Sequence, residues 1–306
     1  MLKLIFTRIL EAIPTLFILI TLSFFLMRFA PGNPFTSDKN LPPEVMENIN
    51  AKYGFDKPLI EQYSNYVGGV LHGDFGPSFK YKDYTVSELI ASALPVSAKV
   101  GFWAFILTLI TGVTIGTFAA LKQNSWIDYL VMSSSMFGVV LPSFVLAPVL
   151  IYIFSIGLGW LPAGGWNGGQ WQYMVLPILA MSFLYIATFA RITRGSMIET
   201  LNSNFIRTAK AKGLSTSRIV LTHAMRPALM PIVSYMGPAF VGIITGSVVI
   251  ETIFGLPGIG KLFVNAAFNR DYSLVLGITI LIGTLFIVFN AIVDLLLAWI
   301  DPKIRY

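Results

Sequence analysis

The sequence contains no cysteine, which excludes both a disulfide framework and a thiolate metal site. Charged residues are also scarce: they make up 12% of the 306 residues, whereas a soluble domain has roughly 25%. Apolar residues account for 55% of the chain, and the mean hydropathy is +0.73. We therefore expect a polytopic membrane protein rather than a soluble domain.

Histidine is nearly absent as well, and the only two, His72 and His223, fall in segments expected on opposite sides of the membrane. They cannot share a metal ion, and no set of Ser, His and acid can be placed on one face. We accordingly predict no catalytic residue, no metal site and no cofactor in this chain, which is then not an enzyme by itself. The net charge of +6 is concentrated in one loop, which favours membrane orientation over nucleic-acid binding.

Long uncharged segments divide the chain into expected membrane spans, since a helix needs about 20 apolar residues to cross a bilayer. The pattern predicts an all-α fold with six transmembrane helices. Residues 1–30 hold a short cytoplasmic start and the first span, and Pro142 and Pro148 lie inside the third. The later spans are expected at 94–121, 128–157, 173–190, 228–250 and 273–299, within a core of residues 94–306.

Residues 31–93 differ in character, because eight acids and five bases occur between Pro31 and Ser92. Aromatic side chains in this stretch offer enough surface to pack. We interpret it as a small ordered insertion outside the membrane, between the first and second helices. The alternative is a disordered loop. The aromatic residues are Phe55, Tyr63, Tyr66, Phe75, Phe79, Tyr81 and Tyr84.

The most basic interval is residues 191–227, which hold seven Lys or Arg and one acid, Glu199. By the positive-inside rule this loop is cytoplasmic. Apolar residues recur in it every four positions, which predicts one amphipathic helix with a single apolar stripe. Gly213 then provides a helix stop, and Ser215 can cap the next helix. The residues of the expected stripe are Met197, Ile198, Leu201, Phe205 and Ala209.

Charge alone allows a simple role for this loop, in which it orients the protein and contacts anionic lipid head groups. Its small residues favour a more specific role. The run from Thr208 to Leu214 resembles the cytoplasmic loop of importer-type ABC permeases, and it is most similar to the peptide permeases of that group. One difference is that Arg207 stands where the general motif begins with Glu, so a carboxylate-mediated contact cannot be carried over.

The resemblance extends over nearly the whole chain, through YGFDKPLIEQY, HGDFGPSFKYKDYTVSELI, VIETIFGLPGIG and the DPKIR ending. It implies the type I ABC importer permease fold, with a coupling helix that seats in a cleft of an ATP-hydrolysing subunit. Small residues let such a helix approach a partner closely, and basic residues can meet acids at the partner's rim. The implied coupling residues are Arg207, Thr208, Ala209, Lys210, Ala211, Lys212, Gly213, Leu214 and Ser215.

The same resemblance implies a permease subunit of an oligopeptide importer in the bacterial inner membrane, with both termini cytoplasmic and half of the translocation pathway in this chain. The implied partners are a second, C-type permease subunit, two ATP-binding subunits that carry ATP and Mg, an extracytoplasmic peptide-binding protein, the peptide and membrane lipid. Importers of dipeptides, murein peptides, haem or nickel are alternatives with the same architecture. A secondary transporter is a more distant alternative, since the sequence shows no obvious repeat.

Small residues also mark the end of the fifth span and the turn that follows it. The family's architecture implies that they line the translocation path or its gate, whereas ordinary close helix packing is the alternative for Gly242 and Gly246. The turn matches the skeleton of a phosphate-binding loop, but Leu262 replaces the required Ser or Thr and a membrane helix precedes it. We predict instead a turn that closes the outer end of the pathway. The path residues are Gly237, Pro238, Gly242, Gly246 and Glu251, and the turn residues are Gly255, Pro257, Gly258 and Gly260.

Asp294 lies near the cytoplasmic end of the last span, at a depth where an ionisable group normally has a partner. Arg8 is the expected partner, because the first span begins at the same face. The alternative is that the acid extends to the membrane interface by itself.

Overall fold

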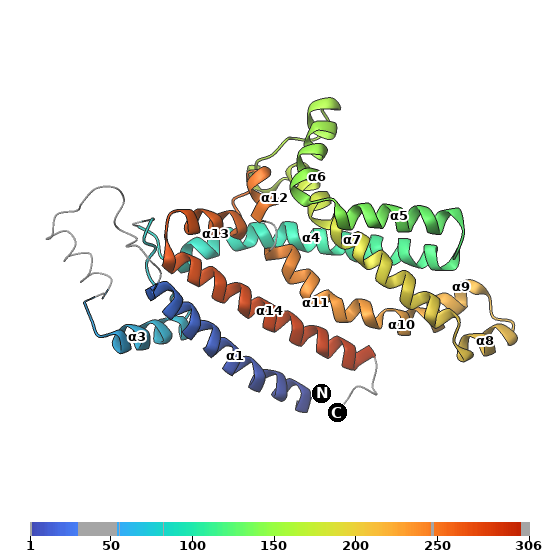
Figure 1. Cartoon of the computed structure of the whole chain (residues 1–306), viewed down its shortest axis with the longest axis horizontal. Helices are drawn as coiled ribbons and strands as arrows, with labels where there is room; N and C mark the ends of the chain where they lie inside the picture. Colours follow the sequence, from blue (N-terminus) through green and yellow to red (C-terminus); the bar gives the residue numbers. More distant parts are fainter. Residues whose placement is uncertain (1, 30–53, 55, 82, 246–247, 301–306) are drawn as a thin grey trace.

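The computed structural model describes residues 2–29, 54, 56–81, 83–245 and 248–300. All secondary-structure elements in these ranges are helices (Figure 1). Five of the described helices are long and apolar enough to cross a membrane, and a sixth span is formed if one sharply bent helix pair is counted. The chain is therefore an all-α, multi-pass membrane protein. Residues 30–53 and Phe55 of the expected insertion, Gly246 and the ending at 301–306 lie outside the described residues.

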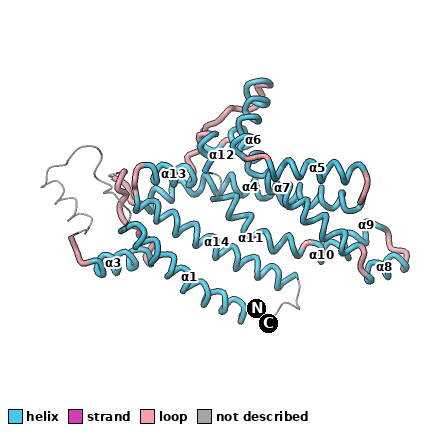
Figure 2. The backbone as a smooth tube through the Cα atoms, in the orientation of Figure 1, coloured by secondary structure: helices cyan, strands magenta, loops and turns pink. Residues whose placement is uncertain are grey.

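The long helices lie roughly along one direction, and Figure 2 shows that most connecting segments lie at their two ends. In chain order the helices before the basic loop are α1 (Leu2–Phe29), α3 (Leu59–Leu71), α4 (Val86–Leu121), α5 (Trp126–Val140), α6 (Ser143–Leu150), η1 (Ile151–Gly157), η2 (Asn167–Gly169) and α7 (Trp171–Leu201). After α7 come α8 (Asn204–Ala211), α9 (Thr216–Arg218), η3 (Ile219–Ala224), α10 (Met225–Ala228), α11 (Met230–Thr245), α12 (Val248–Ile253), α13 (Ile259–Phe268) and α14 (Tyr272–Ile300).

Two helices extend well beyond the spans expected from hydropathy. Helix α4 begins at Val86 rather than at residue 94, because Thr85 and Glu88 form a reciprocal capping box at its start. Helix α7 continues to Leu201 rather than ending at residue 190. The first part of the basic loop is thus a direct helical continuation of a membrane span, while α14 lies within one residue of its expected limits.

The third expected span, 128–157, is wrong as a single helix. Helices α5 and α6 are bent by 106° at Leu141 and Pro142, which both have extended backbone conformations. Proline lacks a backbone N–H and disfavours a helical conformation in the residue before it, so the pair Leu141–Pro142 ends α5. Figure 1 shows α6 turned away from the line of α5, where it packs beside α7 and α12.

The centre of the molecule is the packing of α4 on α7, with α11 against both. Phe189, Leu176 and Ile243 are fully buried there. Gly112 of α4 lets the helices approach closely, since a Cβ at this position would lie 2.5 Å from the Cβ of Phe189. In a membrane, such close packing supplies the stabilisation that water-driven burial supplies in soluble proteins.

The described part of the insertion packs on the helical core, as expected for an ordered element. Tyr63 of α3 shares a hydrogen bond of 2.7 Å with Thr21 of α1, and its ring lies 5.4 Å from that of Phe24. Burial raises the pKa of the neighbouring Tyr66 hydroxyl above its usual value. The segment between η1 and α7, residues 158–170, also folds back on the core, where Gly165 N–H donates to Phe254 O at 2.7 Å.

Candidate functional site

The basic loop folds as a set of short helices, and α8 is the outermost of them in Figure 1. The helix is interrupted at Asn202 and Ser203, so the prediction of a single amphipathic helix from Met197 to Ala209 is wrong. The break changes the helical phase: Phe205 is 49% exposed, and Ile206 takes the buried position instead. Ile206 and Ala209 pack into a cluster that also contains Met197, Ile219, Ala224, Ala228 and Ala120.

Gly213 ends α8 in the left-handed conformation, with φ of +75°. Its N–H donates to Lys210 O at 2.9 Å, and Leu214 N–H donates to Ala209 O at 3.3 Å. This is the Schellman arrangement of a helix end, and the contact of Leu214 with the apolar cluster completes it. The helix stop expected at Gly213 is confirmed.

The outward face of α8 combines small and basic side chains. Ser215 stands at the N-cap position of α9, as expected, but its side chain makes no capping hydrogen bond. Leu214 is partly buried and faces inward. Of the predicted coupling residues, the exposed ones are Arg207, Thr208, Lys210, Ala211, Lys212, Gly213 and Ser215.

An ion pair with a buried carboxylate lies at the base of this loop, and the sequence reasoning missed it. Asp128 of α5 is 1% exposed and receives two hydrogen bonds from Arg194 of α7, from Nε and from Nη2, the latter at 2.6 Å. Asn124 N–H also donates to Asp128 at 2.9 Å. The signal available in the sequence was a lone acid at the edge of 62 uncharged residues, 129–190, which needs a partner.

A second polar cluster lies at the outer turn. Glu251 is 2% exposed, accepts a hydrogen bond from Ser97 Oγ at 2.6 Å and accepts another from Lys261 N–H at 3.0 Å. Ser97 Oγ in turn accepts from Ile259 N–H at 2.8 Å. The Glu251 carboxylate therefore caps the N-terminus of α13, although it belongs to the preceding helix. Glu251 lies in α12, beside the turn, and is enclosed in this structure; its expected place on the translocation path stays a prediction.

The predicted turn residues shape this cluster. A Cβ on Gly258 would lie 2.5 Å from the carboxylate oxygens of Glu251, and a Cβ on Gly260 would lie 2.8 Å from Val248 N. Gly255 has φ of +68°, and Pro257 is exposed. Lys261 belongs to the run that matches the skeleton of a phosphate-binding loop, and its N–H donates to Glu251. This backbone donor is therefore already paired with the protein's own carboxylate.

The remaining predicted path residues lie mostly at helix contacts. A Cβ on Gly237 would lie 2.8 Å from Asn290 Oδ1 of α14, and one on Gly242 would overlap the Tyr185 hydroxyl of α7. Close packing thus accounts for these two glycines, while Pro238 is exposed. A role of this face in a path stays a prediction.

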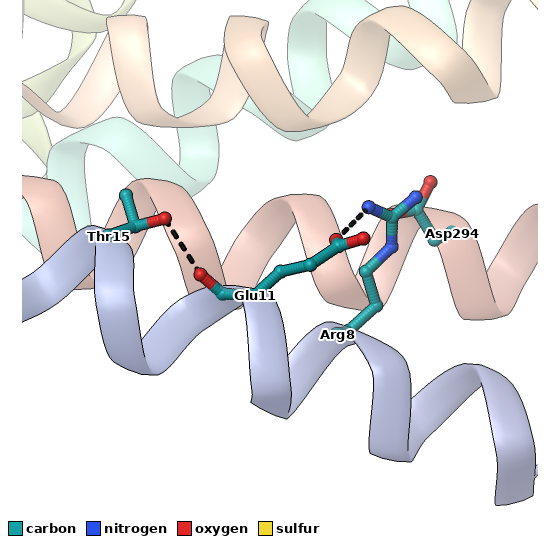
Figure 3. Close-up of polar contacts among 4 residues, drawn as sticks. All are labelled: Arg8, Glu11, Thr15 and Asp294. Atoms are coloured by element: carbon teal, nitrogen blue, oxygen red, sulfur yellow. Dashed lines mark hydrogen bonds and ion pairs between the residues drawn. The ribbon is translucent and has the colours of Figure 1, made fainter.

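Arg8 and Asp294, paired on expectation alone, do meet. Arg8 Nε lies 2.8 Å from Asp294 Oδ2, with side chains 43% and 27% exposed, and Arg8 Nη1 lies 2.7 Å from Glu11 Oε2 (Figure 3). Thr15 Oγ1 donates to the backbone O of Glu11 at 2.7 Å, one turn further along α1. The pair joins the first and last spans, which Figure 1 shows side by side.

Two solved structures share the fold of this chain. A chain of the MetNI methionine ABC transporter matches with a TM-score of 0.57 and 14% identity, over 70% of this chain and 96% of that one. A chain of an amino acid ABC transporter matches with a TM-score of 0.52 and 17% identity, over 71% and 95%.

The chain belongs to the family described as binding-protein-dependent transport system inner membrane component, which matches residues 112–306, and the N-terminal part of such components matches residues 1–101. The oligopeptide transport system permease protein OppB of Haemophilus influenzae is 68% identical over the full length of both chains. OppB of Escherichia coli is 67% identical over the same extent. The dipeptide transport system permease protein DppB of Bacillus subtilis is 40% identical over 95% of this chain and 94% of its own.

Proposed function

We propose that this chain is a permease subunit of an ATP-driven oligopeptide importer and forms half of the translocation pathway. The observation that carries the proposal is α8, a helix with small and basic exposed residues, held by a buried apolar cluster at the end of a membrane helix. Full-length relatives at 68% identity that are named for oligopeptide transport support the substrate class over dipeptides, murein peptides, haem or nickel.

In this proposal two ATP-binding subunits carry ATP and Mg, and one of them docks on α8. A second, C-type permease subunit supplies the other half of the pathway, and an extracytoplasmic binding protein delivers the peptide. Closure of the ATP-binding subunits moves α8, and with it α7, so that the spans change from inward-open to outward-open.

The proposed orientation places both ends of the chain in the cytoplasm of a bacterium, at its inner membrane. Two contacts support it. Arg226 of the basic loop donates from Nε to Ile300 O, at the end of α14, at 2.9 Å. Since Arg8 pairs with Asp294 on the same helix, the start of α1, the end of α14 and the basic loop share one side, which the positive-inside rule makes cytoplasmic.

The test uses the assembled complex in a lipid bilayer, with ATP hydrolysis and peptide uptake measured with and without peptide-loaded binding protein. Gly213→Glu forces an L-residue into the left-handed conformation, at a cost of about 1–2 kcal/mol, and adds an acid to a basic face. Space is not the limit, because a Cβ there would meet nothing within 4 Å. We expect loss of stimulation and uptake.

Gly213→Asn is the matched control, since asparagine tolerates the left-handed conformation, and it should retain most of the uptake. Normal uptake by an assembled Gly213→Glu complex would contradict the role of α8. A wild-type complex that responds to haem or nickel but not to peptide would contradict the substrate class and leave the importer assignment standing.

A further inference from the structure

The ion pair of the buried Asp128 with the partly exposed Arg194 joins α5 and α7, which are separated in the chain by residues 141–170. Arg194 lies about two turns before the end of α7, just upstream of α8, and Asp128 lies in the first turn of α5. The guanidinium uses two nitrogens on the two carboxylate oxygens, a fork geometry that fixes orientation as well as distance. The contact therefore restricts rotation of α5 relative to α7.

A second contact attaches α5 to α7 further along. A Cβ on Gly138 would lie 2.7 Å from the Cβ of Ala187, so the two helices touch closely there. With the Asp128–Arg194 ion pair at one end and close packing at the other, α5 is bound to α7 along its length. Beyond Val140 the chain turns by 106° into α6.

We propose that Asp128 and Arg194 are positioning residues, which make α5 follow α7 when α8 is displaced. This inference rests on the proposed function, in which the ATP-binding subunits move α8. Displacement of α8 passes to the last turns of α7, and the ion pair carries it into α5 and the bent α6. Without the pair, α7 moves while α5 lags, and ATP is hydrolysed with less transport per turnover.

A second ion pair offers a comparison. Arg8–Asp294 also joins two membrane helices, but its side chains are 43% and 27% exposed, whereas those of Arg194 and Asp128 are 24% and 2% exposed, so that the difference lies mainly in the buried carboxylate. It links α1 to α14, and neither helix leads directly into α8. Removal of this pair should leave the amount of peptide transported per ATP unchanged.

The experiment measures substrate molecules transported per ATP in the reconstituted complex, together with the thermal midpoint of that complex. Removing one partner strands a buried charge and destabilises the fold, whereas replacing both partners by apolar residues of similar volume is often neutral. The test variant is therefore Asp128→Leu with Arg194→Met. We expect a midpoint near that of the wild type and a transport-to-ATP ratio about tenfold lower, in the usual range of coupling between sites.

Arg194→Lys is the second variant, because it keeps the charge and hence the fold but loses the two-nitrogen fork. It should also lower the ratio. The control is Arg8→Met with Asp294→Leu, which should keep it. A wild-type ratio in Arg194→Lys, or an equal loss in the control, would overturn the inference.

Failure of the proposed function gives a different result. The ratio is measured with whichever substrate stimulates the wild-type complex. A wild-type complex that ignores peptide contradicts the oligopeptide assignment, while the ratios of the variants with the true substrate still decide the role of the ion pair.

Discussion

At several glycines of this chain one added carbon atom would clash with a neighbour, and Gly258 shows this most clearly. The place that a Cβ would take lies 2.5 Å from the carboxylate oxygens of Glu251, inside normal contact distance. Glycine is needed here for space rather than for backbone freedom, because its φ of −99° is open to any residue. The turn after α12 therefore requires a residue without a side chain opposite the Glu251 carboxylate.

We predict that Gly258→Ala displaces Glu251 and breaks its hydrogen bond with Lys261 N–H. A buried group left without its partner costs about 1–3 kcal/mol, which thermal unfolding of the purified complex in detergent would detect. Gly195→Ala is the control, because a Cβ on this exposed α7 residue would meet nothing within 4 Å and alanine favours helix. Equal midpoints for the two variants would contradict the steric argument.

At the scale of elements, one buried carboxylate holds the insertion to the core. Asp271 is fully buried and caps α14 by accepting from Leu274 N–H at 3.2 Å. It also accepts from Phe79 N–H at 3.1 Å and from Ser78 Oγ. Asp271 therefore anchors a loop to the start of α14, although the loop lies some 190 residues earlier in the chain.

We predict that Asp271→Ala releases the segment around Ser78 from the core. Limited proteolysis of the purified complex should then cleave the chain between residues 72 and 85 several times faster than in the wild type, because locally unpaired segments open more often. Asp74→Ala is the control, since Asp74 is exposed and accepts only the local Gly76 N–H at 2.9 Å among its described bonds. Cleavage at the same rate in both variants would contradict the anchoring role.

Element by element, the sequence predicted what depends on hydropathy and missed what depends on phase. Uncharged runs located the spans, and α14 follows its expected limits closely. Periodicity suggested one helix through Leu201 and Phe205, but it cannot register a break that rotates the next helix by a fraction of a turn. Pro142 was visible inside the third span, yet composition does not distinguish a proline kink from a 106° bend.

At the scale of the whole molecule, polar contacts between distant residues were the least predictable feature. Arg8 and Asp294 could be matched because Arg8 lies near the start of the first span and Asp294 near the end of the last, which six spans place on the same face. Asp128 and Arg194 were both visible as charges, but several basic residues of the loop could have served as the partner of Asp128. Only the packing of α5 on α7 selects Arg194.

The helix end at Gly213 was easier to predict than the residues that hold α8 in place. Gly213 and the small residues before it follow a local pattern, which a sequence displays directly. Ile206, which fixes α8 on the molecule, became recognisable only once the break after α7 was known. Local chemistry is thus readable from the sequence, whereas support from other elements requires the fold.

The central claim is that the exposed face of α8 is where the ATP-binding subunit docks. The chain has no cysteine, so a single one can be introduced and labelled with a photoreactive probe without background from this subunit. In the assembled complex, Ala211→Cys on α8 should cross-link to the ATP-binding subunit, while Pro257→Cys at the outer turn should not. Cross-linking from Lys122→Cys in the turn between α4 and α5, with none from Ala211→Cys, would contradict the account.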